Sequence, residues 1–327
     1  MITRRTALAL PFGLLAPAAY GDTPPPICMV MNSAGASVSV IDMNTRQVIA
    51  TEPAFREPSH WALTPDRKIL YVCDAGGNAF FSFDPITGAP LNHFEIADPY
   101  QLAYSPDNKY LVVNALRLNH VDVYDAASLS LVKRFKAGEM PSHLDFSPDG
   151  RWCFSSQQKT NALFSFDVQT LEPRWTVPIG NTPAGVLWLN GKVIVCIMGE
   201  NGIIEVDPVD GRITRRTETG PGAHNVFYDE DNKILYISNR GPGDTSLTAL
   251  DPETLEIKRT YKIPGGPDDI EIAPDGKIWV ARRFAEAVSI LDPVTGDYDT
   301  IPVGRSPHGI YLSTCLTRKG KLTAQII

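Results

Sequence analysis

The stretch GEMPSHLDFSPDGRWCFSSQQKTNALFSFDVQTL (residues 138–171) contains the signals of several short strands and two turns. SHLDFS and ALFSF alternate between apolar and polar residues, as half-buried strands do, and RWCFS between them favours another strand. SPDG (residues 147–150) predicts a turn, because Pro presets φ and both Asp and Gly tolerate tight backbone geometry. Asp167 begins a second turn, and a less regular fourth strand is predicted around residues 173–177.

This unit recurs about every forty residues along the chain. Counterparts of Asp167, spaced 40 to 44 residues apart, are Asp42, Asp84, Asp125, Asp207, Asp251 and Asp292. The residues that lead into the first strand are also seven: Pro58, Pro99, Pro141, Pro183, Ala223, Pro267 and Pro307. Four strands in a period of this length are typical of a β-propeller, so the sequence predicts an all-β fold with seven antiparallel blades.

The two sets of landmarks are offset by part of a blade. The chain starts with second, third and fourth strands, near residues 27–32, 37–41 and 47–51, and it ends with an isolated first strand at residues 308–313. We therefore expect the C-terminal strand to be innermost in the blade built from the three N-terminal strands. Such a ring has no free sheet edge around its circumference.

Four segments carry a family resemblance: TPDRKILYVCD (residues 64–74), SPDGRWCFSS (147–156), DEDNKILYISN (229–239) and APDGKIWVAR (273–282). Together with the following strands, which end in FDP, YDA, LDP or VDP, they resemble the YVTN or YncE-like repeats of bacterial seven-bladed propellers. The resemblance covers about residues 27–313 and implies the fold rather than an activity, because the repeated residues belong to turns and core. WLNGKVIVC in the fifth unit departs from the pattern.

The first 21 residues have the features of a signal peptide. Arg4 and Arg5 precede an apolar run, and Ala19 and Gly21 occupy the −3 and −1 positions of a cleavage site. The TRRxxL arrangement also resembles a twin-arginine export signal, so both the Sec and the Tat route stay open. We expect a protein of the periplasm or the exterior.

The predicted organisation is a signal peptide at residues 1–21, a leader at 22–26, the propeller at 27–315 and a tail at 316–327. Loss of Arg4 and Arg5 changes the formal net charge from −7 to −9, since residues 1–21 contain no acidic residue. This charge disfavours nonspecific binding to nucleic acid or to anionic membranes. We expect a monomer without a membrane anchor in the mature chain, and a protein partner or a small anionic ligand.

The five cysteines do not form a disulfide framework. Cys73, Cys153 and Cys196 fall in second strands and are expected in the core. Repeat alignment places Cys28 and Cys315 in the closing blade, four positions apart across the turn between its first and second strands. In an oxidising compartment, a disulfide between them is feasible.

Chemistry is expected on one face of the ring, the top face, where the loops before the first strands and after the second strands surround the central channel. The loops before the first strands supply His60, Tyr100, Gln101, His143, His224, Asp268, Asp269 and His308. The loops after the second strands supply Asn32, Asp74, Asn114, Arg117, Gln157, Glu200, Asn239, Arg240, Arg282 and Arg283.

The four histidines suggest a site for copper, zinc or iron, or an acid–base site. His60 and His143 stand two residues after the leading residue of their unit, whereas His224 and His308 stand one residue after it. Because neighbouring side chains on a strand point to opposite faces, the spacing predicts that the four do not all converge. They would then bond to neighbouring blades.

The arginines of the top face suggest a carboxylate or phosphate ligand, since a guanidinium matches both groups. The alternative is that they pair with Asp74, Glu200, Asp268 and Asp269. The Asp residues of the repeated turns are expected to bond backbone N–H groups, without a catalytic role.

Three functions stay open at this stage. The preferred function is a binding or accessory propeller that acts through its top face, because this function requires the fewest specific features in the sequence. The others are a lactonase-like hydrolase and a propeller that binds a metal or redox cofactor through its histidines. The sequence requires no cofactor.

Overall fold

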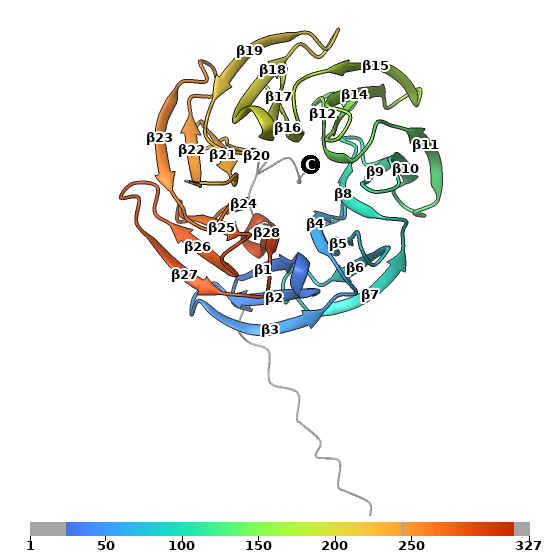
Figure 1. Cartoon of the computed structure of the whole chain (residues 1–327). Coiled ribbons are helices and arrows are strands. Elements are labelled where there is room, and N and C mark those ends of the chain that lie inside the picture. The colour runs from blue at the N-terminus through green and yellow to red at the C-terminus, as the bar shows by residue number, and fades with distance from the viewer. Residues whose placement is uncertain (1–23, 244, 317–327) are drawn as a thin grey trace, which may run out of the picture.

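The computed structural model describes residues 24–243 and 245–316 and shows seven four-stranded antiparallel sheets arranged in a ring around a central channel (Figure 1). The described residues contain no α-helix; beside the strands they form three short 3₁₀ helices, η1 (Ser33–Gly35), η2 (Met198–Glu200) and η3 (Ser313–Leu316). The prediction of a seven-bladed propeller is confirmed.

The strands of each blade run in order from the channel to the outside. The innermost strands are β4 (Pro58–Leu63), β8 (Pro99–Tyr104), β12 (Pro141–Phe146), β16 (Pro183–Leu189), β20 (Ala223–Asp229), β24 (Pro267–Ile272) and β28 (Pro307–Leu312). The second strands are β1 (Ile27–Asn32), β5 (Leu70–Asp74), β9 (Tyr110–Ala115), β13 (Trp152–Gln157), β17 (Lys192–Ile197), β21 (Ile234–Asn239) and β25 (Ile278–Arg282).

The third strands are β2 (Ser37–Asp42), β6 (Ala79–Phe83), β10 (His120–Asp125), β14 (Ala162–Asp167), β18 (Gly202–Val206), β22 (Ser246–Leu250) and β26 (Ala287–Leu291). The outer strands are β3 (Gln47–Pro53), β7 (Pro90–Glu95), β11 (Leu131–Lys136), β15 (Glu172–Pro178), β19 (Ile213–Glu218), β23 (Ile257–Lys262) and β27 (Tyr298–Pro302). We number the blades from the closing one: blade 1 holds β28 and β1–β3, blade 2 holds β4–β7, and so on to blade 7 with β24–β27.

The repeated sequence landmarks lie at strand boundaries. Each innermost strand begins at the residue that the repeat predicted, from Pro58 in blade 2 to Pro307 in blade 1. The repeated Asp residues stabilise the turns after the third strands: Asp42 Oδ1 accepts hydrogen bonds from the backbone N–H groups of Asn44 and Thr45, and its counterparts act in the same way. The turn role expected for these carboxylates is confirmed.

Blade 1 closes the ring as the offset predicted. In its sheet, β28 lies innermost and pairs antiparallel with β1, with Leu312 opposite Cys28 (Figure 1). The strand also binds blade 2, because Trp61 Nε1 donates to the Ile310 carbonyl oxygen at 2.7 Å and the Tyr311 hydroxyl donates to the Pro85 carbonyl oxygen at 2.8 Å. The two ends of the propeller are therefore held in one blade.

The divergent fifth blade keeps the four-stranded architecture with a different turn. Asn190 and Gly191 connect β16 to β17, and both have positive φ, 49° and 76°. Asn-Gly favours this two-residue hairpin turn because both residues tolerate the left-handed region. The SPDG turn is thus replaced by one that suits the twist of a hairpin.

The disulfide that the sequence made feasible between Cys28 and Cys315 is not formed. All five cysteines are free and buried. Alternation along β1 directs Cys28 toward the core that blade 1 shares with blade 7, which includes Trp279, whereas Cys315 belongs to the core shared with blade 2, which includes Met29. Repeat alignment correctly placed both residues in blade 1 but did not resolve which face of its sheet each one occupies.

The predicted signal peptide, and most of the predicted tail, lie outside the described residues. Within residues 24–243 and 245–316, no helix has the length and apolar character needed to cross a membrane.

Candidate functional site

The innermost strands share a β-bulge near their start. In blade 2, Pro58 lies opposite Asp74, but the next pair is Trp61 with Val72, so β4 contains one more residue than β5 in this interval. In blade 6, Ala223 lies opposite Asn239 and Asn225 opposite Ser238, which is again one extra residue. A bulge interrupts the regular alternation of side chains. The first and the second residue after the leading position can therefore both reach the channel.

The bulges bring all four top-face histidines together, which corrects the prediction that they diverge. The ring centroids of His60 and His308 lie 4.5 Å apart, those of His60 and His143 lie 5.2 Å apart, and His143 and His224 are also separated by 5.2 Å. His224 and His308 complete the circuit at 6.2 Å. Each residue is at most 1% exposed. Four imidazoles from blades 1, 2, 4 and 6 thus form one buried cluster in the channel.

Hydrogen bonds assign the ring protons of two of these histidines. His60 Nδ1 lies 2.9 Å from the Tyr100 carbonyl oxygen, and because a carbonyl only accepts, Nδ1 carries the proton. His143 Nδ1 lies 3.1 Å from Ser142 Oγ. Ser156 donates its hydroxyl proton to the Ala184 carbonyl oxygen at 2.7 Å, so Ser142 donates to Ser156 and must accept from His143. In both histidines, Nε2 is left with a lone pair.

The other two imidazoles face Asp268. His224 Nδ1 lies 2.7 Å from Asp268 Oδ1, and His308 Nε2 lies 3.7 Å from Oδ2. No described residue bonds Nε2 of His60, His143 or His224, or either ring nitrogen of His308. Buried polar atoms without a partner are rare in proteins and are costly. The cluster therefore presents several imidazole lone pairs that meet no donor from the described part of the chain.

Burial keeps these imidazoles neutral. It lowers the pKa of His60 to about 3 and that of His224 to about 4, in spite of the nearby carboxylate. The pKa values of His143 and His308 are also lowered well below the usual range, mainly by burial. A neutral imidazole is the form that ligates metal ions and accepts protons.

Asp268 is the anionic centre beneath the top face. Arg240 Nη1 donates to both of its oxygens at 2.7 Å, and Arg283 Nη1 donates to Oδ2 at 2.9 Å. Burial acts to raise the pKa of the Asp268 carboxyl, but the guanidinium groups and imidazoles around it outweigh burial and hold this pKa well below its usual value. Asp268 is thus ionised, and two arginines neutralise it.

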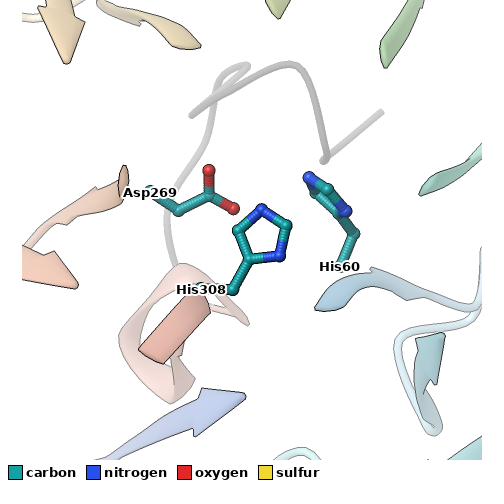
Figure 2. A group of neighbouring side chains, drawn as sticks. All are labelled: His60, Asp269 and His308. Atoms are coloured by element: carbon teal, nitrogen blue, oxygen red, sulfur yellow. The ribbon is translucent and has the colours of Figure 1, made fainter. Parts of the chain in front are cut away.

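Asp269, the next residue, approaches a different pair of histidines. Figure 2 shows its carboxylate beside the His308 imidazole, with the His60 imidazole on the other side of His308. One ring nitrogen of His60, one of His308 and a carboxylate oxygen of Asp269 all lie within 4.8 Å of one another. Asn225 Nδ2 donates to Asp269 Oδ1 at 2.8 Å and orients this carboxylate. A second group with the same spacing contains His224, Asp268 and His308.

Three predicted site residues do not join the cluster. Arg282 turns into blade 7, where Nη1 donates to Ser289 Oγ and Thr300 Oγ1 at 3.3 Å, and its neighbour Arg283 reaches the channel instead. Asp74 accepts hydrogen bonds from four backbone N–H groups, including those of Phe55 and Gly77, and so shapes a loop. Arg117 stays at the top face in ion pairs with acidic residues.

A hollow of about 580 Å³ opens at the top face among loops of blades 1, 2, 3 and 7. Its charged lining residues are Arg56, Glu57, Asp98, Arg117 and Arg283. Arg283 therefore lines the hollow and also bonds Asp268 of the buried cluster. Arg56 was not among the predicted site residues, because it lies two residues before the leading Pro58, outside the repeated positions that align at the channel.

Substitution of Asp268 tests how the channel charges are balanced. Asp268→Asn is expected to lower the free energy of unfolding by about 3 kcal/mol or more, because it leaves two partly buried guanidinium groups without a counter-charge. Asp299→Asn is the control, since Asp299 is 68% exposed and pairs with Arg46 at the surface; a change within about 1 kcal/mol is expected. Urea unfolding measures both. Equal losses in the two variants would contradict the assigned role.

The geometry thus defines a seven-bladed propeller with a buried histidine–carboxylate cluster at its channel. The chain belongs to the YNCE-like beta-propeller family, whose model matches residues 8–318. A search of curated proteins gives no match.

Several solved structures share the fold at low sequence identity. The periplasmic gluconolactonase of Pseudomonas aeruginosa is 20% identical with a TM-score of 0.71, over 88% of this chain and 98% of that one. Hydrazine synthase of Kuenenia stuttgartiensis is 19% identical with a TM-score of 0.67, over 77% and 88%. A dihydro-heme d1 dehydrogenase is 17% identical with a TM-score of 0.68, over 94% and 78%. At these identities the likeness concerns the fold alone.

Proposed function

We propose that this protein is an exported metal-binding propeller, whose channel holds one divalent transition-metal ion between His60, His308 and Asp269. The observation that carries the proposal is the convergence of their ligand atoms within 4.8 Å in a buried cluster with unpartnered imidazole nitrogens. Two histidines and one carboxylate are a ligand set that zinc and iron accept, and imidazole also suits copper.

The surroundings of the three ligands favour such a site. Metal-binding histidines usually donate their second ring N–H to a carbonyl or carboxylate, as His60 Nδ1 does to the Tyr100 carbonyl oxygen. The hydrogen bond from Asn225 orients Asp269 in the same way. In tetrahedral zinc sites the ligand atoms lie about 3.4 Å apart. Only small side-chain rotations are therefore needed to bring the ligand atoms of His60, His308 and Asp269 from their present spacing to the spacing of a metal site.

The second group of possible ligands is less suitable. Asp268 is already neutralised by Arg240 and Arg283, and a cation bound there would lie beside two guanidinium groups. Asp269 belongs to the first group, with His60 and His308. We therefore assign the metal to His60, His308 and Asp269, and assign to Asp268 the task of orienting His224.

Burial argues against the hydrolase alternative. A lactonase-like reaction would need a substrate in contact with an acid–base group, yet His60, His143, His224 and His308 are at most 1% exposed. A metal ion needs far less space than an organic substrate. Export is supported by the sequence features of residues 1–21, and binding of a protein partner through the top face stays a prediction.

Metal titration tests the proposal. Protein stripped with a chelator is expected to bind one Zn²⁺ or Co²⁺ per chain, and bound Co²⁺ should acquire a visible absorption spectrum. Because each supplies a ligand, His60→Ala, His308→Ala and Asp269→Asn should each weaken binding about 100-fold or more.

His143→Gln is the matched control, since it removes a buried imidazole of the same cluster that is outside the assigned ligand set. Circular dichroism and thermal unfolding establish that each variant is folded. Stoichiometric binding that survives all three ligand substitutions, or the absence of binding to the folded native protein, would refute the proposal.

A further inference from the structure

We propose that the hollow on the top face is a separate binding site for a small hydroxylated monocarboxylate, whose carboxylate group binds Arg56 and Arg283. This inference goes beyond the metal site and does not depend on it. The hollow, about 580 Å³ in volume, has the size of a small-molecule site. It is formed by loops of four blades, since its lining includes Ser33, Gly76, Leu118 and Arg283.

The two acidic residues of the hollow share one guanidinium group. Arg117 Nη1 donates to Asp98 Oδ1 at 3.1 Å, and its Nη2 donates to Glu57. Asp98 Oδ2 also accepts from the backbone N–H groups of Arg117 and Leu118. These contacts fix both carboxylates at the wall of the hollow.

The guanidinium groups of Arg56 and Arg283 have N–H donors without a partner among the described residues. Among the described residues, the Arg56 guanidinium has no ion-pair or hydrogen-bond partner, and its side chain is exposed to the hollow. Arg283 makes one side-chain hydrogen bond within the same residues, from Nη1 to Asp268 Oδ2. A guanidinium has five N–H donors in a planar fork that matches a carboxylate. The hollow therefore offers unsatisfied donors for an anion.

Charge and polarity narrow the class of ligand. Three arginines and two acidic residues line the hollow, a formal excess of one positive charge. This excess matches one carboxylate better than a doubly charged phosphate, which would also be repelled by Glu57 and Asp98. The same two acidic side chains can accept hydrogen bonds from ligand hydroxyl groups. A hydroxy acid suits both kinds of residue in the lining, because its carboxylate can bind the arginines and its hydroxyl groups can donate to the acidic side chains.

Titration calorimetry and ligand-observed NMR test this site with lactate and glycerate. Lactamide serves as the neutral analogue, and inorganic phosphate as the competing anion. Chelator-treated protein is used, so that a failed metal site does not affect the result. Lactate or glycerate should bind, lactamide should bind at least about tenfold more weakly, and added salt should weaken the binding of the anions.

Substitutions locate the site. Arg56→Gln should weaken binding of the hydroxy acid about tenfold or more, and Arg56→Lys should have a smaller effect because it keeps the charge but loses the fork. Arg305→Gln is the control, because Arg305 is an exposed arginine of the top face that does not line the hollow. Absence of hydroxy-acid binding, binding of phosphate alone, or equal affinity in Arg56→Gln and the native protein would overturn the proposal.

Discussion

A chain that ends before His308 is expected to lose cooperative folding altogether. The deletion removes five of the six residues of β28, the innermost strand of blade 1, and all of them are buried. Ile310, Tyr311 and Leu312 are at most 1% exposed, and burial of each large apolar side chain stabilises a protein by about 1.5–3 kcal/mol. Their sum approaches the whole stability of an ordinary domain, about 5–15 kcal/mol.

The truncation has further consequences beyond the lost strand itself. It opens the hydrogen-bonding edge of β1 and removes the carbonyl that accepts from Trp61 Nε1. The matched control ends at Leu316, which keeps β28 and η3 and should melt cooperatively near the temperature of the full chain. Thermal unfolding followed by circular dichroism compares the two. A cooperative transition in the shorter chain would contradict the closure described for blade 1.

The second large effect expected is a steep loss of stability in acid. Unfolded histidine has a pKa of about 6.5, whereas burial lowers the pKa of folded His224 to about 4 and that of His60 to about 3. Below pH 6.5 the histidines of the unfolded chain therefore become protonated, whereas those of the folded cluster stay neutral. Stability is fully present above this pH and is lost as the pH falls toward the folded pKa values.

The number of buried imidazoles sets how steeply the free energy of unfolding changes with pH. Each neutral histidine contributes about 1.4 kcal/mol per pH unit, so the four together should remove about 5 kcal/mol between pH 5.5 and 4.5. Urea unfolding of metal-free protein across this range measures the slope. His143→Asn, which removes one of the four titrating groups, should reduce it by about one quarter. A free energy of unfolding that stays constant between pH 7 and 5 would contradict the prediction, because the histidines would then bind protons equally well in the folded and the unfolded chain.

Local sequence signals predicted the architecture because they concern turns and strand boundaries. The periodic Asp residues accept hydrogen bonds from the N–H groups two and three positions later, and such contacts depend on neighbours in sequence alone. The leading residues from Pro58 to Pro307 mark the starts of the innermost strands for the same reason. Even the altered turn at Asn190 and Gly191 is a local signal with a known conformation.

The membership of the site was predicted better than its geometry. His60, His143, His224, His308, Asp268, Asp269 and Arg240 were all placed at the channel from repeat alignment. Their convergence was missed, because the prediction assumed regular alternation and every innermost strand has a bulge. The differing spacings of the histidines after the leading residue were a signal of this bulge. Arg282 and Arg283 were both candidates for the top face, and only Arg283 reaches the channel, since adjacent residues at a strand end point in different directions.

The sequence by itself determined the number of blades, their turns and the offset that closes the ring, because each depends on residues near one another in the chain or on a simple count. Only the tertiary structure decided that four imidazoles meet, that Asp268 takes two arginines while Asp269 approaches His60 and His308, and that Cys28 and Cys315 stay apart. These relations join residues from different blades. They depend on the direction of each side chain at a bulge or across a sheet, and that direction is set by packing around the whole ring.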